Sequence, residues 1–222
     1  MADMRNRTKS PWIWWAGAAV AGAALARWQL PRLFTEQPKY ELEAKLGMLE
    51  IRRYPPRWVA ETRVQNSWDA ALGEGFRRLA RYIFGNNQPS RPARRPEKLA
   101  MTAPVNVRVG RGLVGTKADA ATASHVVSFN LPAGRTSESL PRPGDERVTI
   151  ALKPEARMAV LRYRGGRDGD TVAAKFLELL VALRRAGLRH KGNPQFAGYD
   201  PPSTLPVLRR NEVWIELEPR SA

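Results

Sequence analysis

The sequence predicts an α+β fold in which two strand–helix–strand–strand repeats form one curved or barrel-like antiparallel sheet, with a helix near each half and a membrane segment in front. Three observations lead to this prediction. The hydrophobic side chains change from the two-residue period of strands to the period of helices in the same order twice. Each predicted helix is followed by a glycine, which often ends helices. An apolar run without charges lies near the N-terminus.

The composition is that of one globular domain with an additional segment. The chain has 222 residues, of which 43% are hydrophobic, and this length can bury a sizeable core. It has no cysteine, which excludes disulfides, zinc–thiolate sites and thiol catalysis. The formal net charge of +16 favours anionic partners such as lipid head groups, nucleic acid or a ligand that carries carboxylates.

Residues 1–34 are predicted to be a targeting segment with a short linker. Residues 11–26 carry no charged side chain, and three cations precede them: Arg5, Arg7 and Lys9. A basic stretch before an apolar run is typical of a signal peptide or signal anchor. We expect a retained anchor with the folded part outside the cytoplasm, because positive charges favour the cytoplasmic side. The alternative is a soluble exported protein that is cleaved near Ala26, after a small–x–small pattern.

The first repeat, at about residues 51–131 of the folded domain 35–222, combines strands with one amphipathic helix. Its helix is predicted over residues 67–84, where Ser67 can cap the first turn and a single face carries Trp68, Leu72, Phe76, Leu79 and Ile83. The strands of this part are expected at residues 40–51, 58–64, 97–105 and 125–131.

The second repeat, at about residues 156–218, returns to the same order. Its strands are expected at residues 158–163, 195–199 and 212–217, with a helix over residues 171–186. Two such units leave a cleft between the halves, and an apolar cleft is the usual place for a ligand.

The stretch EKLAMTAPV (97–105) alternates like a strand yet contains a proline, which cannot donate a hydrogen bond to a neighbouring strand. This stretch resembles the SOUL haem-binding proteins. Four other pieces resemble that family in the same order: IRRYPPRWVAET (51–62), WDAALGEGFRRLARYIFGNN (68–87), VSFNLP (127–132) and GNPQFAGYDPPSTLPVLRRNEVWIEL (192–217). The resemblance implies a distorted antiparallel β-barrel flanked by two helices. It also implies that EKLAMTAPV lines the concave side of the sheet and, with the first helix, forms an apolar surface for a tetrapyrrole. Pro104 would then end regular pairing at the edge of the strand.

The resemblance suggests which residues hold haem or another porphyrin. Such a ligand needs an apolar slot, cations for its two propionates and, usually, an axial ligand to the iron. The candidate apolar residues are Phe76, Leu79, Ala80, Ile83, Met101 and Val105, and the candidate cations are Arg77, Arg81, Arg209 and Arg210. The two histidines, His125 and His190, lie in no motif that matches a ligand position, so the metal ligand is left open.

The expected function is that of a membrane-tethered or exported, non-catalytic carrier or buffer of haem or related tetrapyrroles. One alternative is an enzyme that acts on the macrocycle, for example by removing its iron, and another is a binding module for other amphipathic small molecules. No metalloprotease, serine hydrolase or P-loop motif is present, so we expect no enzyme. Nucleic acid is not expected as a partner, because arginine is spread over most segments. Anionic lipid beside the anchor is a simpler use of the positive charge.

Overall fold

The computed structural model describes residues 35–89, 95–110 and 123–219. The predicted membrane segment, residues 1–34, lies outside this part of the chain. Within the described residues, no helix has the length and apolar character needed to cross a membrane.

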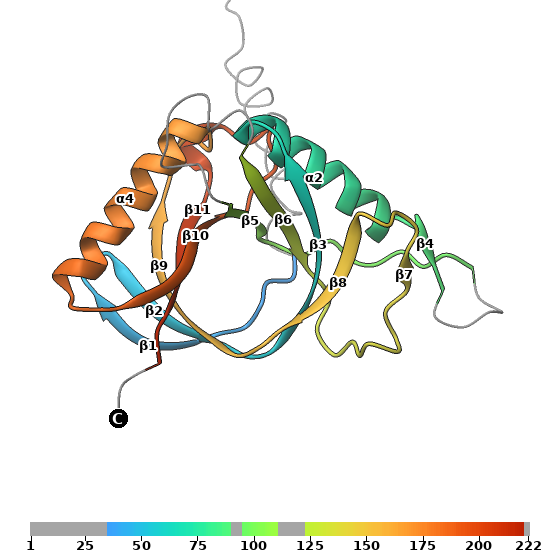
Figure 1. Cartoon of the computed structure of the whole chain (residues 1–222), viewed down its shortest axis with the longest axis horizontal. Coiled ribbons are helices and arrows are strands. Elements are labelled where there is room, and N and C mark those ends of the chain that lie inside the picture. The colour runs from blue at the N-terminus through green and yellow to red at the C-terminus, as the bar shows by residue number, and fades with distance from the viewer. Residues whose placement is uncertain (1–34, 90–94, 111–122, 220–222) are drawn as a thin grey trace, which may run out of the picture. The chain divides into compact units, whose positions relative to one another are not determined.

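The domain is built on one large antiparallel sheet of nine strands (Figure 1). Across the sheet, the strands are β1 (Glu41–Leu46), β2 (Leu49–Tyr54), β9 (Ala156–Tyr163), β11 (Asn211–Leu217), β10 (His190–Gly198), β5 (Val105–Val109), β6 (Ser124–Asn130), β3 (Arg57–Gln65) and β8 (Val148–Lys153). The α+β class is therefore confirmed. Two further short strands, β4 (Asn87–Gln88) and β7 (Arg142–Pro143), pair with each other beside the sheet.

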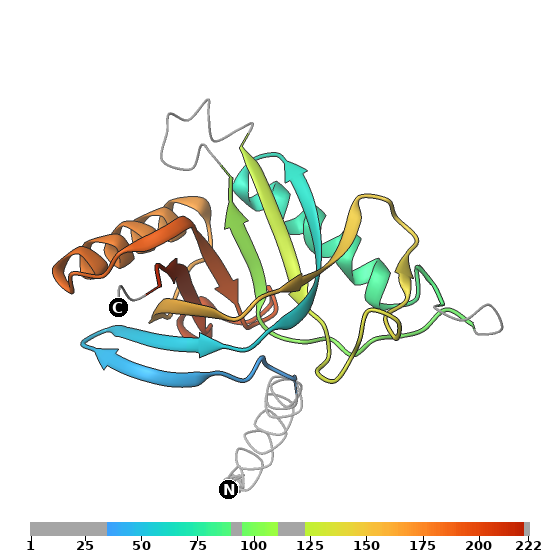
Figure 2. The same cartoon turned by 60° about the horizontal axis from the view of Figure 1, so that its bottom comes forward.

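The sheet does not close into a barrel, so this part of the prediction is wrong. Strands β1 and β8 are its two edges, and β1 pairs only with β2. Figure 2 shows the hairpin of β1 and β2, in blue, at one margin of the domain. Strand β1 is largely exposed and carries the charged residues Glu41 and Lys45, which disfavour pairing with a further strand.

The strand order has an internal symmetry. Read from the β8 edge, the order is β8-β3-β6-β5, and read from β2 it is β2-β9-β11-β10. The first half of the chain contributes β3, β5 and β6 as neighbours, and its remaining strand, β2, pairs with β9 of the second half. The second half contributes β9, β10 and β11 as neighbours, and its remaining strand, β8, pairs with β3 of the first half. The two halves meet where β5 pairs with β10.

Two helices cover the same face of the sheet (Figure 1). Helix α2 (Trp68–Ile83) lies over β3 and β6, and helix α4 (Gly169–Arg185) lies over β9 and β11. Gly75 permits a close approach of α2, because a Cβ atom there would lie 2.4 Å from Cγ2 of Val127. Ser67 stands at the start of α2 but makes no capping bond with its side chain, whereas the Asp168 side chain accepts a hydrogen bond from the backbone of Thr171 in α4.

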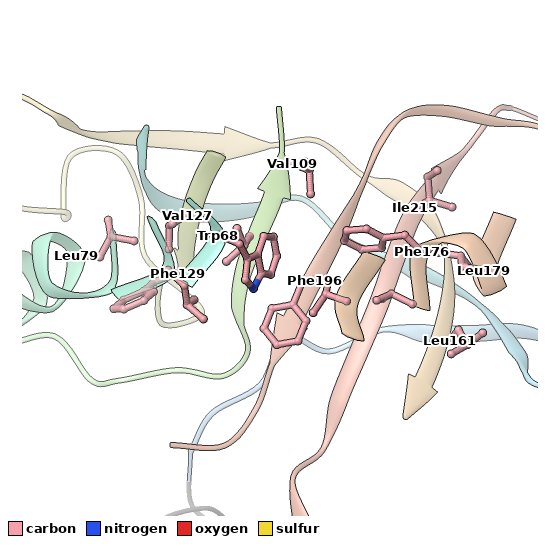
Figure 3. Close-up of a cluster of buried hydrophobic side chains, with 14 of the residues drawn as sticks. Trp68, Leu79, Val109, Val127, Phe129, Leu161, Phe176, Leu179, Phe196 and Ile215 are labelled. Atoms are coloured by element: carbon pink, nitrogen blue, oxygen red, sulfur yellow. The ribbon is translucent and has the colours of Figure 1, made fainter. Parts of the chain in front are cut away.

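The core lies between the helices and the sheet. Trp68 and Leu79 of α2 and Phe176 of α4 pack there with residues that alternate along the strands, such as Val127 and Phe196 (Figure 3). The other set of alternating residues faces the helix-free side. The helix-free side is the inner side of the curved sheet (Figure 1).

EKLAMTAPV is not a strand of the sheet, contrary to the prediction. Strand β5 begins only at Val105, and Pro104 immediately precedes it with a cis peptide bond. The preceding segment is held instead by single contacts: the amide of Leu99 donates to the carbonyl of Ile83, and the Thr102 hydroxyl donates to the carbonyl of Asn130. Proline cannot donate to a ladder, so regular pairing starts after it.

Candidate functional site

The predicted ligand residues on α2 fall on two sides of the helix. Leu79 and Ile83 are 0% and 2% exposed and belong to the core, and Ala80 is partly buried beside them. A side chain that is covered by the sheet cannot line an open slot. The hydrophobic face of α2 therefore serves the core, and only its margin remains for a ligand.

Phe76, Arg77 and Arg81 lie on the exposed side of α2. Phe76 is 37% exposed and packs edge-on against Phe129, with 5.4 Å between the ring centroids. Neither arginine makes an ion pair with any described residue, so both are available to an anion. The neighbouring Arg78, in contrast, pairs with Glu74.

The remaining predicted residues are distributed over two places. Met101 and Val105 are half-buried and pack against the core near α2. Arg209 and Arg210 follow the short 3-10 helix η1 (Pro206–Leu208) and are occupied by protein groups. Arg209 donates to the carbonyl of Thr204, and Arg210 ion-pairs with Glu212 at 2.8 Å. Both C-terminal arginines thus already bind groups of the protein itself, whereas Arg77 and Arg81 of α2 make no ion pair with a described residue.

An open hollow of about 430 Å³ lies where α4 ends and β10 begins. It is lined by Leu180, Leu183, Arg184, Leu188, Arg189, His190 and Glu218. The three leucines make an apolar wall, of which Leu183 is only 1% exposed. Arg184 makes no ion pair with a described residue, whereas Arg189 pairs with Glu218 at 2.9 Å. This hollow combines an apolar surface, two guanidinium groups and an imidazole.

The other histidine, His125, is completely buried at the end of β6. It packs edge-on against Trp68, with 5.5 Å between the rings, and neither ring nitrogen has a hydrogen-bond partner. Burial lowers the pKa of His125, and the nearby backbone of Asn66 offsets this effect only in part. The side chain is therefore a neutral core residue, enclosed on the helix side of the sheet.

On the helix-free face of the sheet, the second half is filled by a buried polar cluster around Glu212. The Glu212 carboxylate is 0% exposed and accepts hydrogen bonds from Arg52, Arg210, Tyr199 and Trp214, at 2.8 to 3.2 Å. Burial alone would raise the pKa of Glu212, but the two arginines outweigh it and hold the pKa below its ordinary value. Every acceptor position of this carboxylate is used, which indicates a structural role.

The same face also holds an open polar groove of about 160 Å³, which strands of both halves line. Cations, amides and carboxylates line it, and they come from β3, β5, β6, β8, β10 and β11. Its residues alternate with the core: Asn106 and Arg108 line the groove, while Val107 between them is 0% exposed. The described part of the chain has no group of three or more acidic or histidine side chains that would hold a metal ion.

The comparison with known protein families agrees with the motifs. A family model described as SOUL heme-binding protein matches residues 35–216. The chain belongs to this family. It is 30% identical over 205 residues to heme-binding protein 2 of Homo sapiens, which covers 90% of each protein. It is 29% identical over 190 residues to heme-binding protein 2 of Mus musculus, which covers 85% of this chain and 83% of that protein.

The SOUL-family assignment predicted from the motifs is thus confirmed, and the ligand class expected from it is the one that the family is named for. A solved structure with a similar fold is the crystal structure of the EcmrR C-terminal domain, with a TM-score of 0.55 over 81% of this chain and 98% of that one. The sequence identity of 11% limits this likeness to the fold.

Two features of this SOUL domain escaped the sequence analysis. His190 lies before the strand that the sequence predicts at residues 195–199, whereas β10 begins at His190 itself. Pairing with Leu217 fixes His190 next to the end of α4. Arg57 lies within IRRYPPRWVAET, but no local pattern marks it as a ligand residue, and its surroundings become visible only when β3, β6 and β8 lie side by side.

Proposed function

We propose that this SOUL-family protein binds haem or a related tetrapyrrole and acts as a non-catalytic carrier or buffer. The hollow beside His190 carries the proposal, because it offers the three groups that a haem requires. Leucines provide the apolar contact, Arg184, which pairs with no described carboxylate, suits a propionate, and the exposed His190 imidazole is an axial ligand type for iron. Its volume of about 430 Å³ lies within the range of small-molecule sites.

Titration of the purified full-length chain with haemin and with iron-free protoporphyrin tests this proposal. His190→Ala is expected to weaken haemin at least about tenfold and to shift its Soret band. The affinity for the iron-free macrocycle should stay the same, because only iron needs the imidazole. Two adjacent exposed arginines give a matched pair: Arg184→Ala, in the hollow, should weaken both ligands, and Arg185→Ala, outside it, should weaken neither. Unchanged binding in His190→Ala and Arg184→Ala would remove the hollow from the mechanism.

A second function, chemistry on the macrocycle such as removal of iron, is favoured by one observation. His190 and Glu218 line the same hollow, so a proton donor and a carboxylate stand near a bound ligand. A carrier returns haem unchanged, whereas an enzyme of this kind releases iron-free porphyrin. Incubation of the haemin complex, followed by porphyrin fluorescence, separates the two functions, and we expect no fluorescence above that of free haemin.

We further propose that residues 1–34 tether the protein to a membrane, with the SOUL domain outside the cytoplasm. The supporting evidence is the charge-free run at residues 11–26 behind three cations. The full-length protein should remain in the membrane pellet at high salt and be released by detergent. A soluble product that begins near Ala26 would instead show a cleaved signal.

A further inference from the structure

The groove on the helix-free face contains two cations without a counter-ion. Lys153 pairs with Glu61 at 2.7 Å, and Lys191 pairs with Glu216 at 3.0 Å. Arg57 and Arg108 line the same groove, and neither lies within ion-pair distance of a carboxylate of the described residues. Since the two lysine pairs cancel, the groove retains two positive charges from its two arginines.

Arg57 is the more unusual of the two, because it is largely withdrawn from water. Its Nη1 atom is buried without a hydrogen-bond partner, and its Nε donates to Oδ1 of Asn130 at 3.2 Å. The guanidinium lies over the Tyr54 ring at 5.1 Å. Burial lowers the pKa of Arg57, and the electrostatic effects of Tyr54 and Glu216 offset this only in part. A partly buried cation without a carboxylate partner destabilises the fold until an anion neutralises it.

Neutral hydrogen-bonding groups surround these cations. The groove is also lined by Asn106, Ser128, Asn193 and Gln195. Two arginines with amide and hydroxyl groups are the usual means of recognising a carboxylate or a phosphate group. The volume of about 160 Å³ is well below that of the hollow beside His190, so it suits a small anion and not a macrocycle.

We infer that this groove is a second binding site, for a small anion that carries carboxylate or phosphate groups. It has no lining residue in common with the hollow proposed for haem. Strand β10 serves both, because successive side chains of a strand point to opposite faces: His190 lines the hollow and Lys191 lines the groove. The two ligands therefore bind on opposite sides of the sheet.

Calorimetric titration of the full-length chain with inorganic phosphate and with succinate, at constant ionic strength, tests the inference. At least one anion should bind the wild type and raise its melting temperature, and the tighter of the two identifies the anion class. Arg57→Met and Arg108→Met should each weaken binding about tenfold or more. The control Arg142→Met removes an exposed arginine that does not line the groove and should leave binding within about twofold.

A further result is expected of Arg57→Met alone. Without anion it should melt at or above the wild-type temperature, because the unpaired cation is gone, and it should gain no stability from the anion. If Arg57→Met does not fold, Arg108→Met still decides, since Arg108 is exposed. Equal anion effects in all four proteins would show non-specific attraction to a basic chain and overturn the inference.

Haemin titrations of the same proteins keep this inference apart from the proposed function. Both groove variants should bind haemin like the wild type. Loss of haemin binding in both would show that the groove holds the propionates, and the separate site would be refuted. A wild-type protein that binds the anion through Arg57 and Arg108 but does not bind haemin would confirm the groove as an anion site. The same result would refute the haem proposal.

Discussion

The Glu212 cluster gives the prediction whose size follows most directly from the structure. Glu212→Gln keeps the shape of the side chain but removes its charge. The carboxylate lies 2.9 Å from Arg52, and the two side chains are 0% and 1% exposed. Breaking a buried ion pair costs about 3–5 kcal/mol, because it leaves the other charge without its partner. Arg52 keeps a second contact, with Glu50 at 2.6 Å, and Arg210, the other cation that loses its partner, is 24% exposed to water, so we expect the lower end, about 3 kcal/mol.

A loss of this size is a large part of the 5–15 kcal/mol by which typical domains are stable. Urea unfolding followed by circular dichroism measures it at pH 7. Glu155→Gln is the matched control: Glu155 is 55% exposed and its ion pair with Arg53 lies at the surface, so its loss should cost less than about 1 kcal/mol. The double change Arg52→Met with Glu212→Leu should not restore the loss, because Arg210, Tyr199 and Trp214 would still lack their acceptor.

The dependence on pH follows from the same cluster. Because the folded pKa of Glu212 is below the ordinary 4.5, the ion pair stabilises the fold fully above that value. The stabilisation is lost as the pH falls through the lower, folded pKa. Glu212→Gln should therefore differ most from the wild type at neutral pH and approach it in acid. A Glu212→Gln protein within about 1 kcal/mol of the wild type at pH 7 would refute this reasoning.

Three further predictions concern the helix side of the sheet. Phe76→Glu should leave the fold intact, because Phe76 is 37% exposed. Unchanged haemin affinity in this folded variant would support the hollow beside His190. A tenfold loss of affinity would instead place the ligand on α2. Gly75→Ala should cost about 1–3 kcal/mol in urea unfolding, since its Cβ would collide with Val127, and a neutral effect would show that α2 can move away. Since burial lowers the pKa of His125, the unfolded chain binds its proton more readily, and wild-type stability should fall as the pH drops below 6.5. His125→Phe should lessen this dependence between pH 5 and 7, and an unchanged slope would contradict it.

The regular elements of this domain could be predicted because they repeat a simple pattern. Helix α2 was expected at residues 67–84 and lies at Trp68–Ile83, and the strand expected at residues 212–217 is β11, Asn211–Leu217. Closure of the sheet could not be predicted, since it depends on whether two edge strands meet. The strand predicted for EKLAMTAPV is wrong because the segment alternates like a strand but bonds to Ile83 and Asn130 instead of to a neighbouring strand. These distant partners cannot be read from the local sequence.

The candidate site was harder to predict than the fold. The hydrophobic stripe of α2 suits either a core or a ligand slot on sequence alone. In the structure the sheet buries Leu79 and Ile83, so these two residues belong to the core. The surroundings of Arg210 and His190 depend on which strands pair, and the sequence does not show this. Arg210 was expected to bind a propionate, but Glu212 and the Tyr199 ring, 3.8 Å from its guanidinium, occupy it. His190 became a candidate only through its place beside α4.

The inner face of the sheet is used differently in two regions. Around β11, Tyr54, Val160 and Trp214 fill that face, and Glu212 satisfies Arg52 and Arg210. In the groove, polar residues from strands of both halves line the face and leave Arg57 without an ion-pair partner among the described residues. Tyr54 joins the two regions: Arg57 lies over its ring, and its hydroxyl accepts a hydrogen bond from Arg52. The buried cluster thus holds Tyr54 in place, and Tyr54 in turn supports Arg57 at the side of the groove.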